Sequence, residues 1–340
     1  MPHQSDHRNA TGSPGDTSGD PSIARVRGGA RPPEALRGGV VAIGNFDGVH
    51  LGHRAVLDEA LACASVLGIP AVVLTFEPHP RELFGGGPVF RLTPAPEKAA
   101  ILGLLGFDGV VERPFDRAFA GLGADEFARD VIARDLGARH VVVGDDFRYG
   151  AKRGGYAGTL RADARFETTV VDAHLSGDAP ASSSRIREAL ASGDCATASA
   201  LLGRRWRVGA SVDHGRKVGR TLGYPTANMT LPGGAELAHG IYAVRFRRAD
   251  GALHDGVASY GRRPTFDDGA PLLETFLFDF DGDLYGEAAH VTLFERLRGE
   301  ERFDGVDALI EQMDRDAARA RQVLAAARPI GPLDAALSFA

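Results

Sequence analysis

The segment Val40–His53 reads VVAIGNFDGVHLGH and decides the fold of the first half of the chain. Its first four residues, Val40–Ile43, form a short apolar run that is typical of a strand buried on both faces. A glycine-rich loop follows, and a helical pattern then extends from about His53 to Leu67. The segment therefore predicts a buried strand, a tight loop and a helix in immediate succession.

The same order of elements recurs along the next hundred residues. Three Leu-Gly pairs each suit a helix that ends in a left-handed glycine, and each precedes an apolar run. These runs are 71–74, 110–111 and 140–143. Repeated helix–glycine–strand units predict right-handed crossovers and a Rossmann-like parallel sheet with helices on both sides. Ligands of such sheets bind outside the carboxyl ends of the strands, so the loops after Ile43, Phe76 and Val143 are the candidate sites.

The rest of the chain has a different pattern of apolar residues and turn signals. Residues 1–37 are rich in Gly, Pro, Ser and Asp and predict a mobile tail before a sheet domain at 38–192. Short strands with turn signals predict a small antiparallel β-barrel at 203–328, which ends in a helix over about 306–324. The expected barrel strands are 206–212, 241–246, 256–260, 274–280 and 290–295. The predicted fold class is α/β followed by β.

Composition excludes several classes of protein. The 340 residues carry 39 Lys and Arg against 45 Asp and Glu, and the net charge of −6 argues against a nucleic-acid partner. Only two cysteines occur, Cys63 and Cys195, which indicates a reducing compartment. No apolar run is long enough to cross a membrane, and the N-terminus lacks the apolar core of a signal peptide. We therefore expect a cytoplasmic protein.

The loop after the first strand carries a histidine pair. His50 and His53 are three residues apart, so both can face one side of the opening helical turn. Glycines let the backbone approach a ligand closely, and a helix start offers free N–H groups and positive potential. These features suit a phosphate that gains charge in a transition state. The simpler interpretation is a glycine-rich turn with two surface histidines.

A metal site is the alternative for the same region. Asp47, His50, His53 and His79 are residue types that can bind zinc. The two histidines nevertheless lack the four-residue spacing and the intervening glutamate of a helical HEXXH site. This absence makes the phosphate interpretation the stronger one.

A second helix start carries serines and arginines. Residues 182–187 read SSSRIR, in which simple helix capping by serine is the conservative interpretation. Hydroxyl groups and the charge of Arg187 at a helix terminus also suit a pyrophosphate group. The sequence contains no P-loop and no Gly-x-Ser-x-Gly motif, so it predicts neither a Walker lysine nor a serine nucleophile.

The candidate barrel contains its own polar segment. Residues 215–228 are glycine-rich and basic and end in Pro-Thr-Ala-Asn, where Thr226 and Asn228 point the same way in an extended chain. Their oxygens suit Mg²⁺, although a plain turn is the alternative. In the later strand, Glu274 shares a face with Phe276, Phe278 and Phe280. This carboxylate is either a solvated edge residue or a desolvated base with a raised pKa.

These motifs together resemble the bacterial bifunctional riboflavin kinase/FAD synthetase family. The matching segments are GNFDGVHLGH, TFEPHP at 75–80, VGDDFRYG at 143–150, SSSRIR, the segment ending in PTAN, and ETFLFDFDGDLYG from Glu274. The resemblance implies an FMN adenylyltransferase (FAD synthetase) domain at 38–192 and a riboflavin kinase domain at 203–328. It implies ATP, riboflavin and FMN as substrates, Mg²⁺ as cofactor, and flavoproteins as possible recipients of the product.

The resemblance also implies roles for individual residues. His50, His53 and Glu274 take the catalytic positions. ATP binding in the adenylyltransferase falls on Gly44, Phe46, Asp47, Gly52, Ser183, Ser184 and Arg187. ATP binding in the kinase falls on Gly215, Gly219, Arg220, Thr226 and Asn228, the last two of which also take the metal positions.

The two implied acceptors differ chemically. The phosphate of FMN is already ionised and can attack the α-phosphorus of ATP without a base. The 5′-hydroxyl of riboflavin must lose a proton, so the kinase needs a base, and Glu274 is the candidate. Two other functions compete with this assignment: a transferase or kinase with only one activity, and a flavin-binding regulator without ATP turnover. Product analysis separates them.

Overall fold

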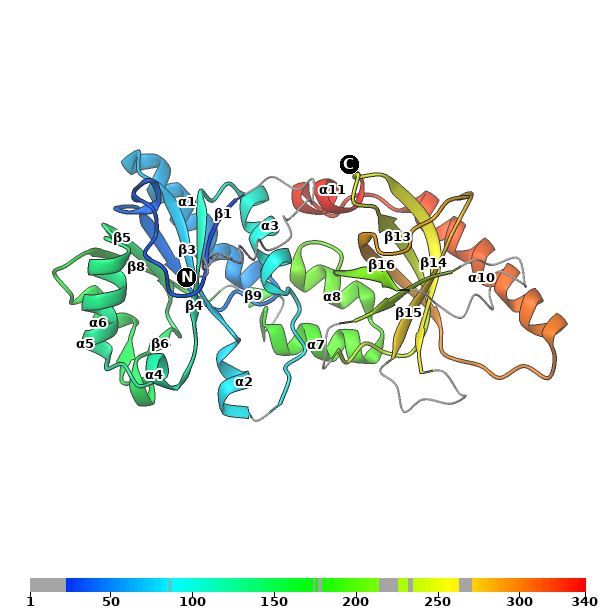
Figure 1. Ribbon diagram of the computed structural model, residues 1–340, viewed down its shortest axis with the longest axis horizontal. Coiled ribbons are helices and arrows are strands. Elements are labelled where there is room, and N and C mark those ends of the chain that lie inside the picture. The colour runs from blue at the N-terminus through cyan, green and yellow to red at the C-terminus, as the bar shows by residue number, and fades with distance from the viewer. Residues whose placement is uncertain are drawn as a thin grey trace, which may run out of the picture.

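The computed structural model contains a sheet domain and a barrel, joined by a pair of helices (Figure 1). The predicted site residues Gly215, Gly219 and Arg220 lie outside the described residues. The residues that the structure describes are 23–85, 87–173, 175–176, 179–213, 226–231, 235–262 and 271–340. Among them, no helix combines the length and the apolar character needed to cross a membrane.

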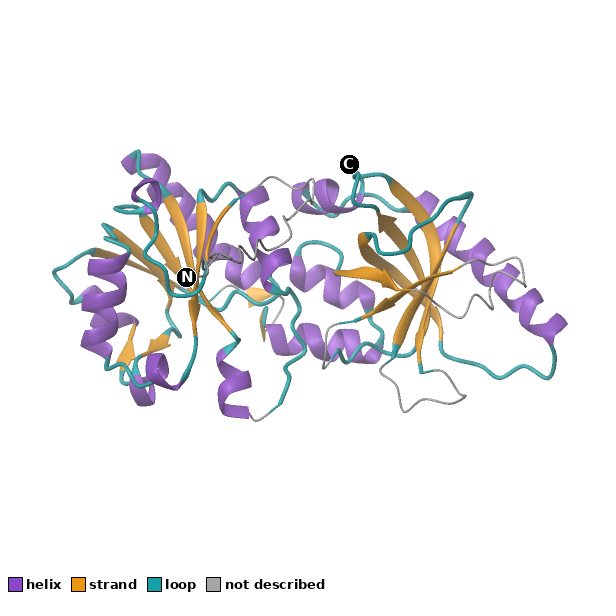
Figure 2. Cartoon of the chain, in the orientation of Figure 1, coloured by secondary structure: helices purple, strands orange, loops and turns teal. Residues whose placement is uncertain are grey.

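The first domain is built on a six-stranded parallel sheet, as predicted. Its apolar strands are buried because helices cover both faces, which the flanking purple helices of Figure 2 show. In spatial order the strands are β1 (Ala24–Val26), β4 (Gly109–Pro114), β3 (Ala71–Glu77), β2 (Val40–Ile43), β5 (His140–Gly144) and β8 (Glu167–Val171).

Alternate residues of each strand serve the two faces of the sheet. On one face Val40 and Ala42 pack against α1 (Leu51–Leu67) and α3 (Ala95–Leu105). On the other face Val41 and Ile43 pack against helical residues of Phe127–Asp135 (η2) and α6 (Ala157–Arg161). Helix α1 begins at Leu51, two residues before the predicted start. The glycines predicted to end helices, Gly68, Gly106 and Gly137, have φ of 62°, 102° and 60°.

The predicted tail is too long. Strand β1 pairs with β4, and the Arg25 guanidinium donates to the Glu112 carboxylate at 2.9 Å. The short helical turn Glu34–Leu36 (η1) buries Leu36 over Gly109, where a side chain would collide with the leucine. Residues 24–26 and 34–36 therefore belong to the first domain, because a few specific contacts anchor a segment of unfavourable composition.

Two helices connect the domains. Helix α7 (Ser183–Ser192) is capped by the Ser182 hydroxyl, and α8 (Cys195–Leu202) is capped by the Asp194 carboxylate. The turn between them uses Gly193 at φ 81°. These helices lie between the sheet and the barrel in Figure 1.

The second domain contains the predicted barrel, which is closed and has six antiparallel strands. Strand β12 was not predicted, and the predicted strand 274–280 extends past the end of β15. The chain leaves β15 after Leu277 and turns at Asp279, which has φ 55°. In spatial order the strands are β11 (Arg207–Asp213), β12 (Thr226–Thr230), β15 (Leu272–Leu277), β14 (Leu253–Gly261), β13 (Gly240–Arg247) and β16 (Ala288–Arg298).

Two C-terminal helices follow the barrel. Helix α10 (Val306–Ala326) packs Ala320 and Leu324 on the outside of the barrel. Helix α11 (Pro332–Ser338) lies beyond the predicted boundary at 328 and returns to the sheet domain, whose core includes Leu333 and Leu337. An apolar face of α11 thus belongs to the core of the first domain, although the helix follows the barrel in the chain.

The remaining elements are short. They are α2 (Pro80–Gly85), α4 (Arg117–Ala120), α5 (Ala124–Glu126), the turn Ala151–Arg153 (η3), and the strand pairs β6 (Arg148–Tyr149) with β7 (Gly155–Tyr156) and β9 (Leu175–Ser176) with β10 (Ala179–Pro180).

Two candidate active sites

The loop between β2 and α1 has an unusual backbone. Phe46, Gly48 and Val49 adopt left-handed φ of 48°, 94° and 43°. A Cβ atom at Gly44 would lie 2.9 Å from the Phe46 ring, and one at Gly52 would lie 2.9 Å from the Ala181 carbonyl oxygen. A side chain at either position would therefore collide with its neighbour, so the loop at the carboxyl end of the sheet requires both glycines.

The predicted histidine pair stands at the start of α1. The Nδ1 atom of His50 accepts a hydrogen bond from the backbone N–H of His53 at 3.2 Å and so caps the helix. The two rings stack with centroids 3.6 Å apart. Because Nδ1 is an acceptor, the neutral His50 ring carries its proton on Nε2. That N–H is a hydrogen-bond donor at a helix N-terminus.

Both imidazoles are neutral at pH 7. Burial lowers the pKa of His50 to about 4, although the nearby Asp47 opposes the shift. Burial, the neighbouring His50 and the Lys98 ammonium hold the pKa of His53 well below its usual range. The Nδ1 atom of His53 is buried and has no hydrogen-bond partner among the described residues. Neutral imidazoles offer a ligand hydrogen bonds rather than positive charge.

Asp47 joins the loop to the second helix start. Its buried carboxylate accepts the Thr93 N–H at 3.0 Å and also accepts a hydrogen bond from the Arg187 guanidinium. The Ser183 hydroxyl donates to the Asp47 carbonyl oxygen at 2.8 Å. The structure thus brings the GNFDGVHLGH and SSSRIR motifs together, whereas Ser184 is exposed on the first turn of α7. Both carboxylate oxygens of Asp47 are therefore occupied by hydrogen bonds from Thr93 and Arg187.

A buried lysine completes this region and was missed by sequence analysis. Lys98 of α3 is only 1% exposed, and its Nζ donates to the Asn45 carbonyl oxygen at 2.9 Å and to the Thr75 Oγ1 at 3.0 Å. Its other neighbour is the Glu77 carboxylate at 3.5 Å. Burial lowers the pKa of this ammonium. Nothing in the local sequence around Lys98 signals the contact, because its partners are more than twenty residues away.

The structure does not support the zinc alternative. Within the described residues, no group of three or more His, Cys, Asp and Glu side chains is placed to hold a metal ion. The Nδ1 atom of His79 accepts the Arg81 N–H at 3.1 Å instead.

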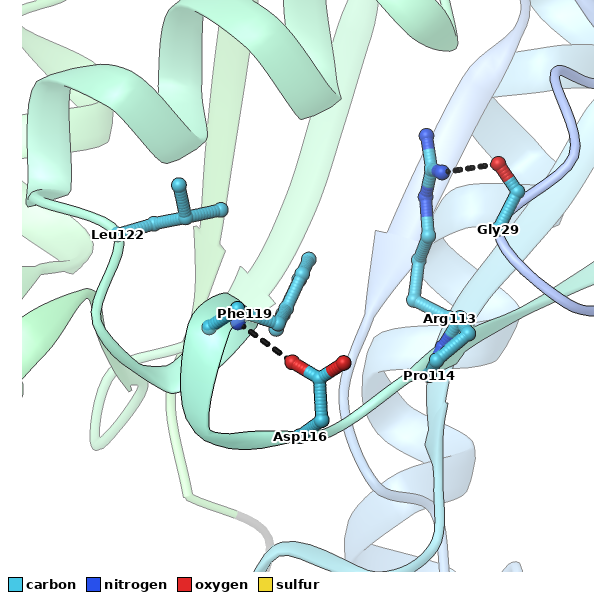
Figure 3. A pocket seen from close by; sticks show the side chains of 7 residues that line it. Gly29, Arg113, Pro114, Asp116, Phe119 and Leu122 are labelled. Atoms are coloured by element: carbon cyan, nitrogen blue, oxygen red, sulfur yellow. Dashed lines mark hydrogen bonds between the residues drawn. The ribbon is translucent and has the colours of Figure 1, made fainter.

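A cavity of about 340 Å³ lies at the carboxyl end of β4 (Figure 3). Arg113 borders it but is already paired, because its guanidinium donates to the Gly29 carbonyl oxygen at 2.8 Å and to Asp135 at 2.5 Å. Asp116 caps α4 through the Phe119 N–H at 2.7 Å. The cavity is lined by Gly29, Arg113, Pro114, Asp116, Ala118, Phe119 and Leu122.

The second candidate site is one outer face of the barrel. Asn228 of β12 lies directly opposite Glu274 of β15, which lies opposite Ser259 of β14 on its other side. In the same pairing of β12 with β15, Thr226 lies opposite Phe276. Since alternate residues share a face, Thr226, Asn228 and Glu274 stand together, while Ala227 and Thr275 point into the barrel.

The aromatic surroundings of Glu274 differ in part from the prediction. Phe276 does share its face, and it contacts the buried cluster between α10 and the barrel. Phe278 and Phe280 lie beyond the end of β15, so the two-residue alternation does not extend to them. Glu274 is half-buried, and the Asn228 Nδ2 donates to the Thr226 carbonyl oxygen at 3.4 Å.

Comparisons with known proteins match both halves of the chain. The FAD synthetase family model covers residues 33–185, and the riboflavin kinase model covers residues 202–324. A bifunctional riboflavin kinase/FMN adenylyltransferase of Haemophilus influenzae is 38% identical over 300 residues, which cover 87% of this chain and 97% of the relative. A relative of the same description from Escherichia coli K12 is 38% identical over 296 residues, or 86% of this chain and 95% of the relative.

A solved structure has the same architecture. A crystal structure described as a macrolide-efflux protein from Streptococcus pneumoniae superposes with a TM-score of 0.76 at 31% identity, covering 84% of this chain and 94% of that one. The chain thus contains both family domains in this order, and it matches a curated bifunctional relative over nearly the whole length of that relative. The chain belongs to the bifunctional riboflavin kinase/FMN adenylyltransferase family and carries both of its enzymatic domains.

Proposed function

We propose that the β2–α1 loop transfers the adenylyl group and that the outer barrel face phosphorylates riboflavin. The observation that carries this division is where the side chains stand: the histidine pair lies at the N-terminus of α1, and Glu274 lies beside Asn228 on a strand face of the barrel. In the loop, the Asp47 carboxylate is buried and already bound by Thr93 and Arg187. On the barrel, Glu274 stands half-buried beside Asn228, at the centre of a strand face.

In the adenylyltransferase site, FMN and ATP need alignment and charge stabilisation. A phosphate oxygen of FMN attacks the α-phosphorus of ATP, a new P–O–P bond forms, and pyrophosphate leaves. His50 and His53 donate hydrogen bonds to the phosphates, and the N-terminus of α1 adds positive potential. Arg187 contributes charge from the start of α7. No group has to remove a proton, because the acceptor is already ionised.

In the kinase site, the acceptor is a neutral alcohol. Glu274 takes the proton of the riboflavin 5′-hydroxyl as its oxygen attacks the γ-phosphorus of ATP, and ADP leaves. Thr226 and Asn228 would hold Mg²⁺, since their hard oxygens lie two residues apart on one strand face. The ion supplies neutralisation of phosphate charge. Roles for Gly215, Gly219 and Arg220 in ATP binding stay predictions.

The compartment and the recipients of the product are part of the same proposal. Both cysteines are free, Cys195 buried and Cys63 half-buried, which agrees with a reducing environment. We propose the cytoplasm as the location and flavoproteins as users of the FMN and FAD made there.

One incubation tests the proposal. Riboflavin, ATP and Mg²⁺ are mixed with the protein, and the flavins are separated by chromatography. We expect FMN to appear first and FAD to follow. FMN without FAD would contradict the adenylyltransferase assignment, and flavin binding without ATP turnover would contradict both.

A further inference from the structure

The segment Arg204–Arg207 connects the two domains through four consecutive side chains. Arg204 donates to the Gly48 carbonyl oxygen at 3.0 Å. Arg205 binds Asp334 of α11. Trp206 donates a hydrogen bond to the Leu92 carbonyl oxygen at 3.0 Å. Arg207 forms an ion pair with Glu97 of α3 at 2.5 Å. Of these four contacts, only the one between Arg204 and Gly48 is made with the β2–α1 loop.

Arg204 is buried to an unusual degree for a charged residue. Its exposed fraction is 1%, and its second contact is the Arg205 carbonyl oxygen, 3.2 Å from Nη1. Its Nε atom is buried without a hydrogen-bond partner among the described residues. Burial lowers the pKa of the guanidinium to about 10, so the group is still charged at neutral pH. A buried cation with one unpaired N–H is costly to keep, which points to a function for the remaining contacts.

Gly48 occupies the most constrained part of the loop. It has φ 94° and stands directly before Val49, which also has positive φ, and two residues before His50. Its N–H donates to the Thr93 Oγ1 at 2.8 Å. Thr93 therefore binds the N–H of Gly48 and Arg204 binds its carbonyl oxygen, and these two residues come from different parts of the chain. Loss of either contact frees a backbone segment that sets the position of His50.

We propose that Arg204 is a positioning residue for adenylyl transfer, which acts from the domain junction by holding the Gly48 carbonyl and thereby the histidine pair. The inference rests on the proposed role of the β2–α1 loop. It adds that the junction of the kinase domain takes part in shaping the adenylyltransferase site. Arg204 itself contacts no substrate in this account.

The chain offers a matched control for the test. Arg205 is the next residue and is a partly buried arginine whose partner is the buried Asp334. Arg204→Met and Arg205→Met remove one guanidinium each from the same segment, and Arg205→Met also leaves Asp334 without its cation, so it is the more severe change to the junction. Only the first change removes a contact with the loop. Arg204→Lys keeps a charged donor and is the conservative variant.

The experiment measures both reactions in each variant, after circular dichroism has established that it is folded. For Arg204→Met we expect kcat for FAD formation to fall by about 10-fold to 100-fold, the range for loss of a charged hydrogen-bond donor. KM for FMN and ATP and the rate of FMN formation should change by less than about 3-fold. Arg204→Lys should recover a large part of the loss, and Arg205→Met should keep both rates near those of the parent.

Hydrogen exchange supplies a readout that does not depend on catalysis. Peptides that cover residues 44–53 should exchange faster in Arg204→Met and stay unchanged in Arg205→Met. An unchanged kcat for FAD formation, or an equal fall of both activities, would overturn the inference. If the parent enzyme makes no FAD from FMN, the proposed function fails instead. The exchange result then decides separately whether Arg204 holds the loop.

Discussion

The two candidate sites of this chain treat charge in opposite ways. At the β2–α1 loop, the imidazoles of His50 and His53 are kept neutral by their surroundings, and the adjacent carboxylate of Asp47 is bound on both oxygens. On the barrel, the carboxylate of Glu274 stands half-buried among strand residues with polar neighbours. Under the proposed assignment, this difference follows from the two acceptors. The ionised phosphate of FMN requires hydrogen-bond donors, and the hydroxyl of riboflavin requires a base.

The largest expected effect comes from replacing Glu274, the proposed base of the kinase site. Glu274→Gln keeps the size and the polarity of the side chain but cannot accept the proton. We expect FMN formation to fall by about 1,000-fold, within the usual range for general bases, while FAD formation from supplied FMN continues. Rates of both reactions, measured on one preparation, test this. A variant that phosphorylates riboflavin at the parental rate would remove Glu274 from the mechanism.

The next largest effect concerns the histidine pair. His53→Ala removes a buried donor at the start of α1, and we expect FAD formation to fall by at least about 100-fold, as for loss of one donor to a charged transition state. FMN formation should stay within about 2-fold of the parent, because the barrel does not use this residue. Equal loss of both activities would contradict the division of labour.

A smaller effect is expected at the metal position. Thr226→Val removes a hydroxyl oxygen while keeping the β-branched shape that suits β12. The Mg²⁺ concentration for half-maximal FMN formation should rise by about 10-fold. Thr226→Ser retains the oxygen and serves as the control. An unchanged Mg²⁺ requirement in Thr226→Val would place the ion elsewhere.

The smallest effect is on stability against pH. The pKa of His50 is lowered to about 4 in the folded protein, so between that value and its ordinary value of 6.5 the unfolded chain binds more protons. The stabilising contribution is complete above pH 6.5 and is lost as the pH falls towards 4. We expect the free energy of unfolding to drop by on the order of 1 kcal/mol from this group between pH 7 and 5.5.

Urea unfolding at a series of pH values measures this drop. The His50→Gln variant should show a shallower decline than the parent over the same interval, whatever its absolute stability. An identical slope in the two proteins would show that His50 does not titrate as its burial requires.

Much of the fold could be predicted because local patterns carry it. The apolar run at Val40–Ile43 and the left-handed glycines after the helices indicate a parallel sheet without any knowledge of tertiary contacts. Strand β12 was missed because its first residues, Thr226–Asn228, follow a proline and a glycine-rich segment, for which a turn is an alternative interpretation. Pairing with β15 overrides that preference, which is a tertiary effect.

The supporting residues of the site could not be predicted. Lys98 reaches Asn45 across 53 residues, and Arg204 reaches Gly48 across 156. No periodicity or spacing encodes such contacts, because they arise only when the sheet, α3 and the domain junction have packed. In contrast, His50 and Asp47 are close in sequence to the backbone that they organise, so their motif was visible.

The most direct test of the central claim is complementation between two variants. Glu274→Gln and His53→Ala are mixed in equal amounts with riboflavin, ATP and Mg²⁺, and FAD is measured over time. We predict little FAD from either variant alone and sustained FAD formation from the mixture, because one protein supplies FMN to the other. Failure of the mixture to make FAD, while each variant retains its own partial reaction, would contradict two independent sites.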